Sequence, residues 1–303
     1  MPEPVTVRVP AKINLHLAVG AARTDGFHEL ITVFHAISLY DEVTAIPANN
    51  LTVSLQGEET EGVPVDESNL ACRAARAVAT RAGVEPAVHL ELRKGIPVAG
   101  GLAGGSADAA AALVACDALW GTELGREELV ELAAGLGSDV AFALTGGTAL
   151  GTGRGERLTP VLAAGHWHWV LAIADGGLST PEVYAELDRL RPEAPDPATP
   201  DALINALRAH DPIQLGELLS NDLQPAAQSL RPALAKTLRV GRELGALGGI
   251  VSGSGPTCGF LVRSHDRAVR LAASLAGTGV SRTVRIAHGP VAGARIVEEG
   301  AEH

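Results

Sequence analysis

The sequence predicts an α+β fold of two domains, and three observations support this class. At 303 residues the chain is long for one hydrophobic core and sufficient for two. Strand-like and helical segments alternate without the regular strand–helix–strand repeat of a doubly wound parallel sheet. The turn-rich stretch GTGRGE at 151–156 separates two halves of different texture. We therefore expect an N-terminal domain over residues 1–155 and a C-terminal domain over residues 156–303.

Short strands and helices are expected in the first half, where alternation and β-branched content indicate strands. The expected strands are 5–9, 15–20, 30–39, 42–46, 51–57 and 87–93. Between the last two, SNLACRAARAVATRAG predicts a helix with Ser68 as its N-cap and Gly83 at its end. A glycine-rich loop then leads into a helix capped by Ser106, and a further helix is expected over 126–137.

The second half contains a strand at 168–174 and a helix at 180–190, for which Thr180 is the expected cap and Pro181 the first residue. Four prolines in 191–201 predict an exposed connector. Two more helices should follow the connector, and then a glycine- and serine-rich turn between two apolar strands within 248–262. A helix over 264–277 and a strand over 282–289 complete the expectation.

Composition and charge exclude several classes of function. The chain is 46% hydrophobic and 19% charged, as in ordinary globular proteins, and its net charge is −11. A negative chain lacks the basic face that nucleic acids and anionic membranes favour. The stretch MPEPVTVRVPAKINL lacks the basic-then-apolar pattern of a secretion signal, so none is expected. The sequence has no 18-residue apolar run and no metal motif around Cys72, Cys116 and Cys258. We expect a cytoplasmic monomer or homodimer with free buried thiols and no bound metal at those cysteines.

The glycine-rich loop (residues 95–107, GIPVAGGLAGGSA) holds five glycines in its first eleven residues and precedes a long Ala-rich helix. Such a loop points bare N–H groups and a partial positive charge at one spot, which suits phosphate. The P-loop lysine after the final glycine is absent, and so is the G-x-G-x-x-G spacing of a dinucleotide fingerprint. A plain surface loop stays possible, although it does not explain why PVAGGLAGG is so apolar.

Three motifs carry a resemblance to a known family. P-x-x-G-G-L-A-G-G-S-A resembles the second motif of the GHMP kinases, which include galactokinase, homoserine kinase and mevalonate kinase. PAKINLHLAVG (10–20) precedes it and VSGSGPTCGF (251–260) follows it, in that family's order. PAKINL followed by RTDGFHEL (23–30), with SNL at 68–70 and LGSDVAFAL at 136–144, is similar to the diphosphocytidyl-methylerythritol kinases in particular. The resemblance implies a two-domain GHMP-kinase-like fold with the active site in the cleft between domains.

The same resemblance implies an activity and its cofactors. The γ-phosphate of ATP, accompanied by Mg²⁺, would move to the 2-hydroxyl of a diphosphocytidyl-methylerythritol, in the non-mevalonate route to isoprenoid precursors. The loop residues would wrap the triphosphate, and two further residues would lie on the adenine side. The implied ATP-binding residues are Pro97, Val98, Ala99, Gly100, Gly101, Leu102, Ala103, Gly104, Gly105, Ser106, Ala107, Asn69 and Lys94.

Lys12 and Asp139 are the catalytic candidates. Lys12 lies in PAKINL between a proline and an apolar strand, and Asp139 lies at a glycine-rich turn in GLGSDVAF. In the family that this sequence resembles, such an Asp faces the substrate hydroxyl and the Lys lies beside it. A carboxylate can take the alcohol proton, and an ammonium can offset charge on the transferred phosphoryl group. From the residues alone, Lys12 could instead be a solvated edge lysine and Asp139 a helix cap.

Substrate recognition is expected from residues that follow the resemblance. Phe27 and Tyr184 would stack on the two sides of the cytosine, with His28 as a hydrogen-bonding ring beside them. Plain core packing of the two aromatic residues is the alternative. Asn14 would lie near the erythritol end, and the late motif adds two residues near the diphosphate or the loop. These two residues are Gly253 and Ser254.

Departures from the family pattern concern nucleotide and base binding. Position 27 is usually tyrosine, and phenylalanine keeps the stacking face while losing the hydroxyl. Ala99, Ala103 and Ala107 stand where glycine or serine is common, and they are tolerable unless φ is positive there. Two rival functions stay open: a related kinase for homoserine, mevalonate or a sugar, and a non-catalytic ligand sensor on the same fold.

Overall fold

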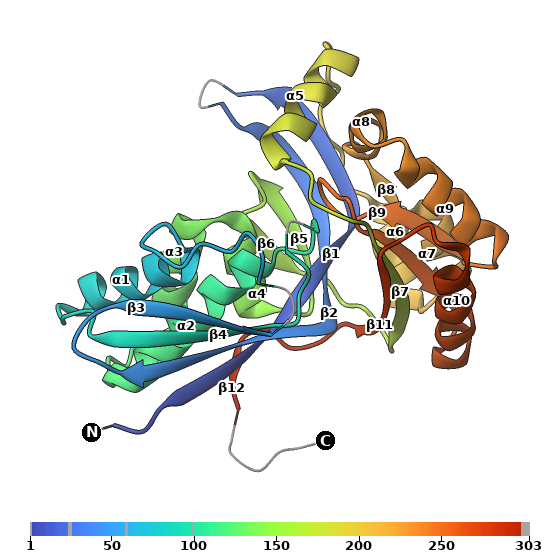
Figure 1. Cartoon of the computed structure of the whole chain (residues 1–303). Coiled ribbons are helices and arrows are strands. Elements are labelled where there is room, and N and C mark those ends of the chain that lie inside the picture. The colour runs from blue at the N-terminus through green and yellow to red at the C-terminus, as the bar shows by residue number, and fades with distance from the viewer. Residues whose placement is uncertain (1, 24–25, 58–59, 99, 298–303) are drawn as a thin grey trace.

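The structure is a computed structural model, and it describes residues 2–23, 26–57, 60–98 and 100–297 (Figure 1). Within these residues the strands form an eight-stranded sheet and a four-stranded sheet. The larger sheet and its helices lie on one side of the molecule, and the smaller sheet with the orange and red helices lies on the other. The α+β class is confirmed.

The larger sheet is built on one long hairpin, β1 (Val5–Ala22) and β2 (His28–Pro47), which pair antiparallel along most of their length. The prediction of two short strands in each of these segments was wrong. Residues 9–15 are buried on both faces, so the period-2 alternation that marks a half-exposed strand is lost there. Register shifts after Pro10 and Asn14 absorb the irregularity while the pairing continues.

The remaining strands extend the larger sheet on both sides of the hairpin. β4 (Val88–Lys94) pairs with the end of β2, and β3 (Thr52–Gly57) pairs parallel with β4. β5 (Thr148–Gly153) pairs with the first half of β2 and with β6 (Arg157–Pro160).

The second half of the chain also contributes to the larger sheet. β8 (Ser220–Asn221) and β12 (Arg295–Ile296) both pair with β1. A division between residues 155 and 156 falls in the turn between β5 and β6, although β6 still belongs to this sheet. The division stays a proposal, and the pairing favours moving it past Pro160.

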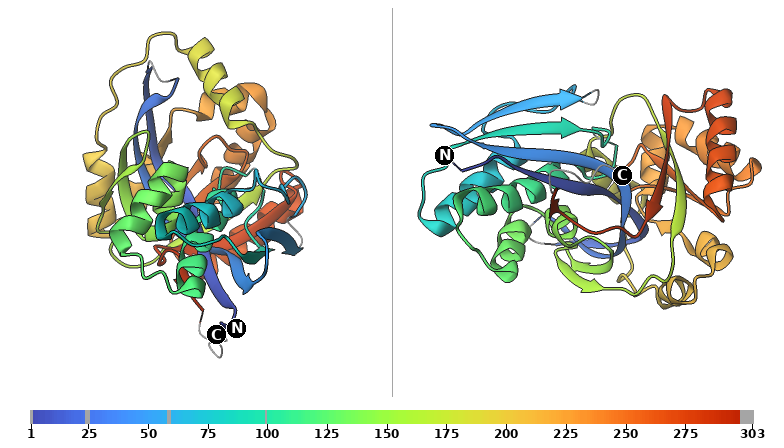
Figure 2. Two further views of the ribbon diagram at one scale, coloured as in Figure 1. Left: turned by 90° about the vertical axis from the view of Figure 1, so that its left-hand side faces the viewer. Right: turned by 90° about the horizontal axis from the view of Figure 1, so that it is seen from below.

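Four helices pack with the larger sheet, and they lie together on one side of it in both views of Figure 2. These helices are α1 (Leu70–Ala82), α2 (Gly104–Trp120), α3 (Arg126–Leu136) and α4 (Ser138–Thr145). α2 is buried on nearly every side, which its small alanines allow because they let its backbone approach the sheet and α1 closely. α4 was not predicted, because it is only eight residues long and its apolar run from Val140 to Leu144 shows no helical period.

Two predicted helix caps were wrong in this half. The N-cap of α1 is Asn69, whose side chain accepts the N–H of Ala71, whereas Ser68 lies outside the helix. α2 begins at Gly104 after Ala103, and Ser106 lies inside its first turn without a capping bond. In both places several polar or small residues compete, and the turn geometry decides which one is the cap.

The C-terminal half is a four-stranded antiparallel sheet with helices around it. Its strands are β7 (Trp167–Ile173), β9 (Gly248–Val251), β10 (Cys258–Val262) and β11 (Thr283–Gly289). Its helices are α5 (Thr180–Leu190), α6 (Asp201–Ala209), α7 (Pro212–Leu218), α8 (Gln224–Leu230), α9 (Ala233–Glu243) and α10 (His265–Thr278). Within the described chain four helices, not two, lie between the connector and β9, because prolines mark three separate helix starts. Pro212 is the first residue of α7, Pro225 is the second residue of α8, and Pro232 directly precedes α9. Ser179, rather than Thr180, occupies the cap position of α5.

The three cysteines are free and buried, as predicted. Within the described part of the chain, the helices are all too short or too polar to span a bilayer.

His35 predicts how stability responds to acid. The ring is fully buried on β2, where Nδ1 contacts the hydroxyl of Thr148 at 2.8 Å, and burial lowers the pKa of His35 to about 3. As the pH falls, the His35 ring therefore binds a proton first in the unfolded chain, near the ordinary histidine pKa of 6.5. Stability should fall as the pH drops from 6.5 toward 3, by roughly 1.4 kcal/mol for each pH unit.

Urea unfolding between pH 7.5 and 4.5 checks this expectation. A His35→Gln variant should be less stable at pH 7.5 but show a shallower decline with acid than the parent protein. His265→Gln, at an exposed position on α10, should keep the parent's pH slope. Equal slopes for the parent and His35→Gln would contradict the assignment.

Candidate active site

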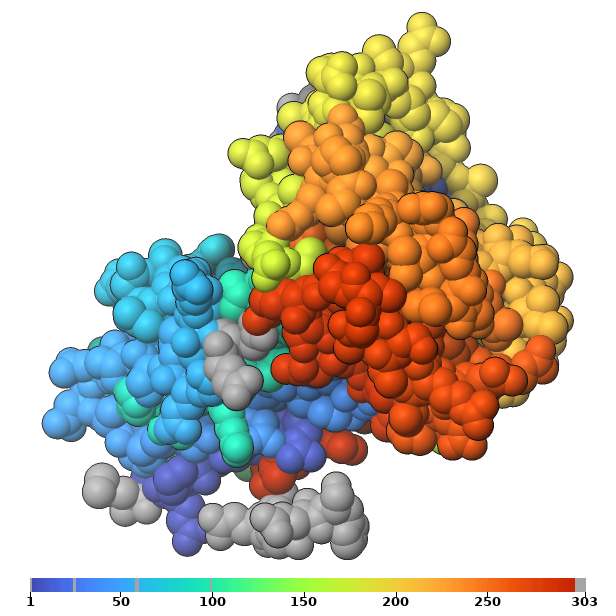
Figure 3. Space-filling view, turned by 45° about the vertical axis from the view of Figure 1, so that its right-hand side comes forward, coloured from blue at the N-terminus to red at the C-terminus, as the bar shows by residue number. Residues whose placement is uncertain are grey.

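A cavity of about 450 Å³ lies where the two halves of the molecule meet, and we call it the first cavity. Figure 3 shows the two halves as separate masses joined along this boundary. The larger sheet, the glycine-rich loop and α4 supply one wall, and the C-terminal half supplies the other. Residues from the C-terminal half that line the first cavity are Leu178, Thr180, Tyr184, Leu223, Gly253 and Ser254. The geometry agrees with the expected cleft between domains.

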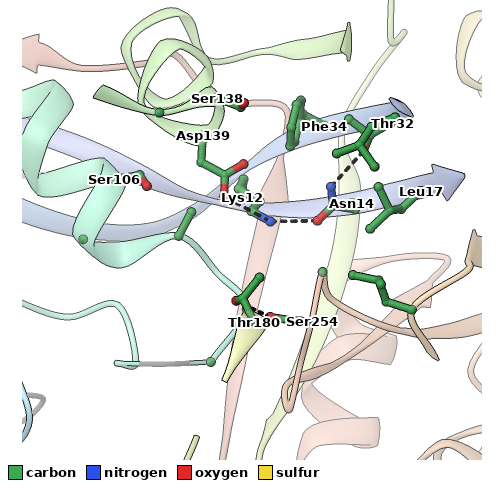
Figure 4. Close-up of a pocket in the computed structure, with 18 of the residues that line it drawn as sticks. Lys12, Asn14, Leu17, Thr32, Phe34, Ser106, Ser138, Asp139, Thr180 and Ser254 are labelled. Carbon is green, nitrogen blue, oxygen red and sulfur yellow. Dashed lines mark hydrogen bonds and ion pairs between the residues drawn. The ribbon is translucent and has the colours of Figure 1, made fainter. Parts of the chain in front are cut away.

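Lys12 and Asn14 reach the first cavity from the same face of β1. Alternate residues of a strand share a face, so Ala11, Ile13 and Leu15 point to the core on the other side. The ammonium of Lys12 donates to Oδ1 of Asn14 at 2.7 Å (Figure 4). Lys12 is only 8% exposed in its side chain, so the alternative of a solvated edge lysine is wrong.

A chain of hydrogen bonds orients the amide of Asn14. Its Nδ2 donates to the hydroxyl of Thr32 at 2.8 Å, and that hydroxyl donates to the carbonyl of His16 at 2.8 Å. With its nitrogen used in this way, Asn14 presents its oxygen to Lys12. The Lys12 ammonium also lies 5.8 Å from the centre of the Phe34 ring. These contacts satisfy a cation that is largely removed from water.

Asp139 meets Lys12 from the first turn of α4. Its Oδ2 lies 3.7 Å from Nζ of Lys12, and a third of its side chain stays exposed toward the first cavity (Figure 4). One helical turn further, Phe142 is buried and stacks on Phe34 with ring centres 4.9 Å apart. That packing turns the same face of α4, and with it Asp139, toward β1. Gly137 occupies the cap position of α4, so the alternative reading of Asp139 as a helix cap is wrong.

The end of the glycine-rich loop and the start of α2 form the floor of the first cavity. Gly100, Gly101 and residues 103–106 line it. The N–H groups of the first three residues of a helix have no partner within it, and the first turn of α2, described in full, carries no acidic residue. The loop therefore presents uncompensated donors and a positive helix end to the cavity.

Not every predicted loop residue reaches the first cavity. Leu102 and Ala107 belong to the core, and Pro97 and Val98 lie outside the lining. Ala99 falls outside the residues that the structure describes. Ala103 has a φ of +62°, a left-handed backbone conformation that is energetically unfavourable for alanine.

The glycine-rich loop is held against the glycine–serine turn (residues 252–257). A Cβ added to Gly101 would lie 2.1 Å from the carbonyl oxygen of Ser252, and the φ of Gly101 is +75°. The Ser252 hydroxyl donates to the Gly101 carbonyl at 2.9 Å, and the Thr257 N–H donates to the Gly100 carbonyl at 3.2 Å. Only glycine permits so close an approach between the two backbones.

Gly253 and Ser254 lie in this turn beside the Lys12 side chain. A Cβ on Gly253 would stand 3.2 Å from Nζ of Lys12. The Ser254 hydroxyl is hydrogen-bonded to that of Thr180 at 2.9 Å, which ties the turn to the start of α5. Both predicted residues therefore line the first cavity next to the lysine.

Asn69 and Lys94, expected on the adenine side of ATP, are not among the residues that line the first cavity, and their expected role stays a prediction. Asn69 is used as the cap of α1, and its amide also donates to the carbonyl of Pro64. The Lys94 side chain is 1% exposed, and its ammonium lies between Asp41 at 2.5 Å and Asp108 at 2.6 Å. The sequence pattern could not distinguish an internal cation from one that faces a ligand.

The buried ion triad of Asp41, Lys94 and Asp108 secures both ends of the glycine-rich loop. Asp41 also accepts the N–H groups of Gly95 and Ile96, at the start of the loop. Burial raises the pKa of Asp108 to about 7. Burial also disfavours the ammonium of Lys94, but the charges of Asp108 and Asp41 outweigh it and raise the pKa of Lys94.

A second cavity, of about 700 Å³, adjoins the first and lies toward the tip of the β1–β2 hairpin. Phe27 and His28 line it from the hairpin, and Tyr184 and Asp188 line it from α5. Tyr184 and Arg154 line both cavities, which makes the two continuous along one wall. The predicted substrate-binding residues Phe27, His28 and Tyr184 are therefore brought together.

The two aromatic residues differ in their surroundings. Phe27 is 52% exposed, and the Arg154 guanidinium lies 4.8 Å from its ring centre, so core packing is excluded for Phe27. Tyr184 is partly buried. It packs against the hydrophobic core of the C-terminal half and against the His28 ring, whose centre is 5.0 Å away. Burial, and secondarily the charge of Asp139, raises the pKa of Tyr184.

Sequence reasoning missed several cavity residues. Arg154 lies in the stretch GTGRGE that was read only as a break, although a lone arginine among glycines was a usable signal. Thr32 and Phe34 lie on β2, and β2 pairs with β1 so that Phe34 stands opposite Asn14. Pairing PAKINL with the following apolar strand would have found both. Thr180 was expected only as a helix cap, and Ser138 was not singled out.

Both halves of the chain match models of one protein family. The family model for the GHMP kinases N terminal domain matches residues 69–147, and that for the GHMP kinases C terminal region matches residues 203–281. The chain is 63% identical over 297 residues to the 4-diphosphocytidyl-2-C-methyl-D-erythritol kinase of Salinispora tropica, covering 97% of this chain and 94% of that protein. It is 59% identical to the enzyme of the same name from Nocardia farcinica, covering 98% of each chain.

Solved structures resemble the whole molecule. A crystal structure of a 4-(cytidine 5'-diphospho)-2C-methyl-D-erythritol kinase has a TM-score of 0.76 at 36% identity, covering 93% of this chain and 98% of that one. A homoserine kinase from Cytophaga hutchinsonii has a TM-score of 0.78 at 18% identity, covering 98% of both chains. The latter likeness is one of fold alone.

Gly101→Ala should disrupt the contact between the glycine-rich loop and the glycine–serine turn. The added methyl group strains the left-handed backbone and also meets the Ser252 carbonyl, so the two segments must separate. Gly62→Ala is the matched control, since Gly62 has φ +78° and open space around it. The control should lose only the stability that a left-handed backbone costs an alanine, about 1–2 kcal/mol.

Chemical unfolding and ATP titration of both variants test this contact. Gly101→Ala should be less stable than Gly62→Ala and bind ATP at least tenfold more weakly than the parent, whereas Gly62→Ala should keep the parent's affinity. If both variants bind ATP alike, the contact does not hold the loop in place.

Lys94→Met should destabilise the fold by about 3–5 kcal/mol, because it leaves two buried carboxylates without their cation. Arg76→Met, which removes an exposed ion pair with Glu67, should change stability little. Differential scanning calorimetry of both variants measures the contrast. A Lys94→Met protein as stable as Arg76→Met would show that the triad is dispensable.

Proposed function

This chain belongs to the 4-diphosphocytidyl-2-C-methyl-D-erythritol kinases of the GHMP kinase family, and we propose from that membership how its two cavities perform the reaction. It is an ATP-dependent small-molecule kinase. The acceptor is 4-diphosphocytidyl-2-C-methyl-D-erythritol, and the phosphoryl group goes to its 2-hydroxyl, a step toward isoprenoid precursors. One observation carries the assignment of roles: Lys12, Asp139 and the open N-terminus of α2 line the same cavity.

The triphosphate of ATP lies along the glycine-rich loop in this proposal. The free N–H groups of Gly104, Gly105 and Ser106 donate to phosphate oxygens, and the positive end of α2 favours their charge. Because the net charge of the chain is −11, this attraction must be local. The close contact with the glycine–serine turn keeps the loop rigid, so the donors are already in place before ATP arrives.

Mg²⁺ is expected to arrive with ATP. Among the described residues, no three His, Cys, Asp or Glu side chains form a group that could hold a metal ion. This fits Mg²⁺, which prefers oxygen ligands and is commonly held by substrate phosphates and water with few protein groups. The Ser106 hydroxyl, at the start of α2, is the protein oxygen that would join them. When bound, the ion neutralises charge on the bridging phosphates.

Asp139 takes the proton of the acceptor hydroxyl as the alcohol oxygen attacks the γ-phosphorus. The new oxygen–phosphorus bond forms while the bond to the bridging oxygen breaks, and ADP leaves with that electron pair. The ammonium of Lys12 stands between Asn14 and Asp139, where it can offset negative charge on the phosphoryl group in transit. Asn14 and Gly253 restrict the lysine to this position.

The cytidylyl end of the substrate lies in the second cavity. The exposed face of Phe27 and the ring of Tyr184 offer apolar surfaces for a base, and His28 offers a hydrogen-bonding edge. Thr180 and Ser254, hydrogen-bonded to each other where the C-terminal wall meets α5, are suited to the diphosphate between the two ends. A kinase for homoserine or mevalonate would have no use for this second cavity.

Asp139→Asn and Lys12→Met should each lower kcat by at least 10²-fold, while ATP and the cytidylyl alcohol bind within about tenfold of the parent affinity. The reason is that both residues act on the reacting atoms rather than on the ends of either ligand. A coupled assay of ADP release, with binding followed by calorimetry, measures both quantities. Glu243→Gln, on the distant helix α9, removes a carboxylate without touching either cavity.

The same assay separates the rival functions. A non-catalytic sensor would bind both ligands and release no ADP from the parent protein. A kinase for another alcohol would turn over homoserine or mevalonate faster than the cytidylyl substrate. If Asp139→Asn retains most of the parent rate, the base is another group.

A further inference from the structure

His28 and Asp188 form a side-chain pair across the second cavity that the reaction scheme does not use. Nε2 of His28 lies 2.9 Å from Oδ1 of Asp188. His28 is the first residue of β2, and Asp188 lies in the last turn of α5, 160 positions further along the chain. The pair therefore joins the tip of the hairpin to the C-terminal half. Both residues line the second cavity.

We propose that Asp188 is a positioning residue that fixes the tautomer of His28, and that the fixed tautomer makes the second cavity select a pyrimidine with an exocyclic amino group over one with an oxygen there. The proposal rests on the proposed function, because it concerns how that function's substrate is read.

The tautomer follows from the partner. An ionised carboxylate only accepts hydrogen bonds, so the nitrogen facing Asp188 must carry the hydrogen. In the neutral ring the other nitrogen, Nδ1, then holds a lone pair. Among the described residues Nδ1 has no hydrogen-bond partner, and it is not sealed from the cavity by protein. Nδ1 is thus an acceptor left for a ligand.

The ring has little freedom to present anything else. Only 8% of the His28 side chain is exposed, and its ring lies 5.0 Å from that of Tyr184 at an angle of 33° between planes. Turning the ring over would place the carbon Cε1 where Nε2 now meets Asp188, and the hydrogen bond would be lost. The packing against Tyr184 and the hydrogen bond together favour one orientation of the ring.

The two pyrimidines differ in what they show to such an acceptor. Cytosine carries an amino group at C4, which donates, whereas the corresponding O4 of a uracil ring accepts. An amino group can donate to the lone pair of Nδ1, but O4 would face it with a second lone pair and stay unpaired. A site built to hydrogen-bond one group rejects the analogue that lacks it, because polar groups then remain unsatisfied. Without Asp188, His28 could carry its hydrogen on Nδ1 and donate it to O4 of a uracil ring.

Steady-state kinetics with the cytidylyl substrate and its uridylyl counterpart test the inference at pH 8, where histidine side chains are ordinarily neutral. Asp188→Asn should raise KM for the cytidylyl substrate about tenfold, leave kcat within about twofold, and reduce the preference for cytidylyl over uridylyl about tenfold. Asp188→Glu should recover most of the preference. Glu182→Gln, on the exposed face of the same helix, should behave like the parent.

Nitrogen-15 NMR of the histidine side chains gives a second, substrate-independent readout. In the parent the Nε2 of His28 should show the shift of a protonated nitrogen and Nδ1 that of a bare one, and Asp188→Asn should move both toward the mixed-tautomer average. An unchanged preference with unchanged shifts would overturn the inference, and so would a fall in kcat without a change in preference. If the parent does not phosphorylate the cytidylyl substrate at all, the proposed function fails, while the NMR comparison still decides the role of Asp188.

Discussion

The approach of two backbones at Gly101 and Ser252 is the constraint on which the site depends. One segment comes from the first half of the chain and the other from the second, and their contact leaves no room for a side chain. The carbonyl of the neighbouring Leu102 accepts the N–H of Lys12, so the same loop is tied to β1 at the residue that carries the ammonium. The relative placement of the helix N-terminus and the lysine therefore follows from backbone contacts, which are stiffer than contacts between long side chains.

The two lysines near the glycine-rich loop lie in different electrostatic surroundings. Above the glycine-rich loop, the first cavity holds the Lys12 ammonium and the start of α2. Beneath the loop, Lys94 is enclosed by Asp41 and Asp108, whose charges its own charge does not fully balance. The raised pKa of Asp108 is the expected response of an acid in such a place, since a proton there reduces the buried negative charge. Lys12 and Lys94 both lie close to this loop, yet Lys12 faces the first cavity and Lys94 stabilises the fold through its buried ion pairs.

The α+β class and the phosphate-binding character of the loop could be foreseen from the residues, because glycines before a helix N-terminus are hard to explain otherwise. The meeting of Lys12 with Asp139 was expected only from the resemblance to the GHMP kinases, since an edge lysine and a helix cap were equally compatible with the local sequence. Other features depended on tertiary context. The long strands β1 and β2 were broken into pieces because burial on both faces erased their alternation. The burial of Lys94 between two carboxylates could not be foreseen, because the local sequence does not say which side of a loop a side chain takes. Thr32 and Phe34 needed the sheet pairing before they could be placed.

The long hairpin has a consequence for the size of ligand that the molecule accepts. Lys12 and Asn14 lie near the middle of β1, whereas His28 pairs with Ala22 at the far end. A pleated strand advances roughly 3.3 Å per residue, and backbone pairing resists stretching or shortening it. The hairpin thus fixes the distance between the two ends of the site. A compound that reaches both Asp139 and His28 must be long enough to match the number of strand residues that separate Lys12 from the end of the hairpin. A small alcohol of suitable chemistry would leave one end of that span empty, so length screens ligands independently of the groups they carry.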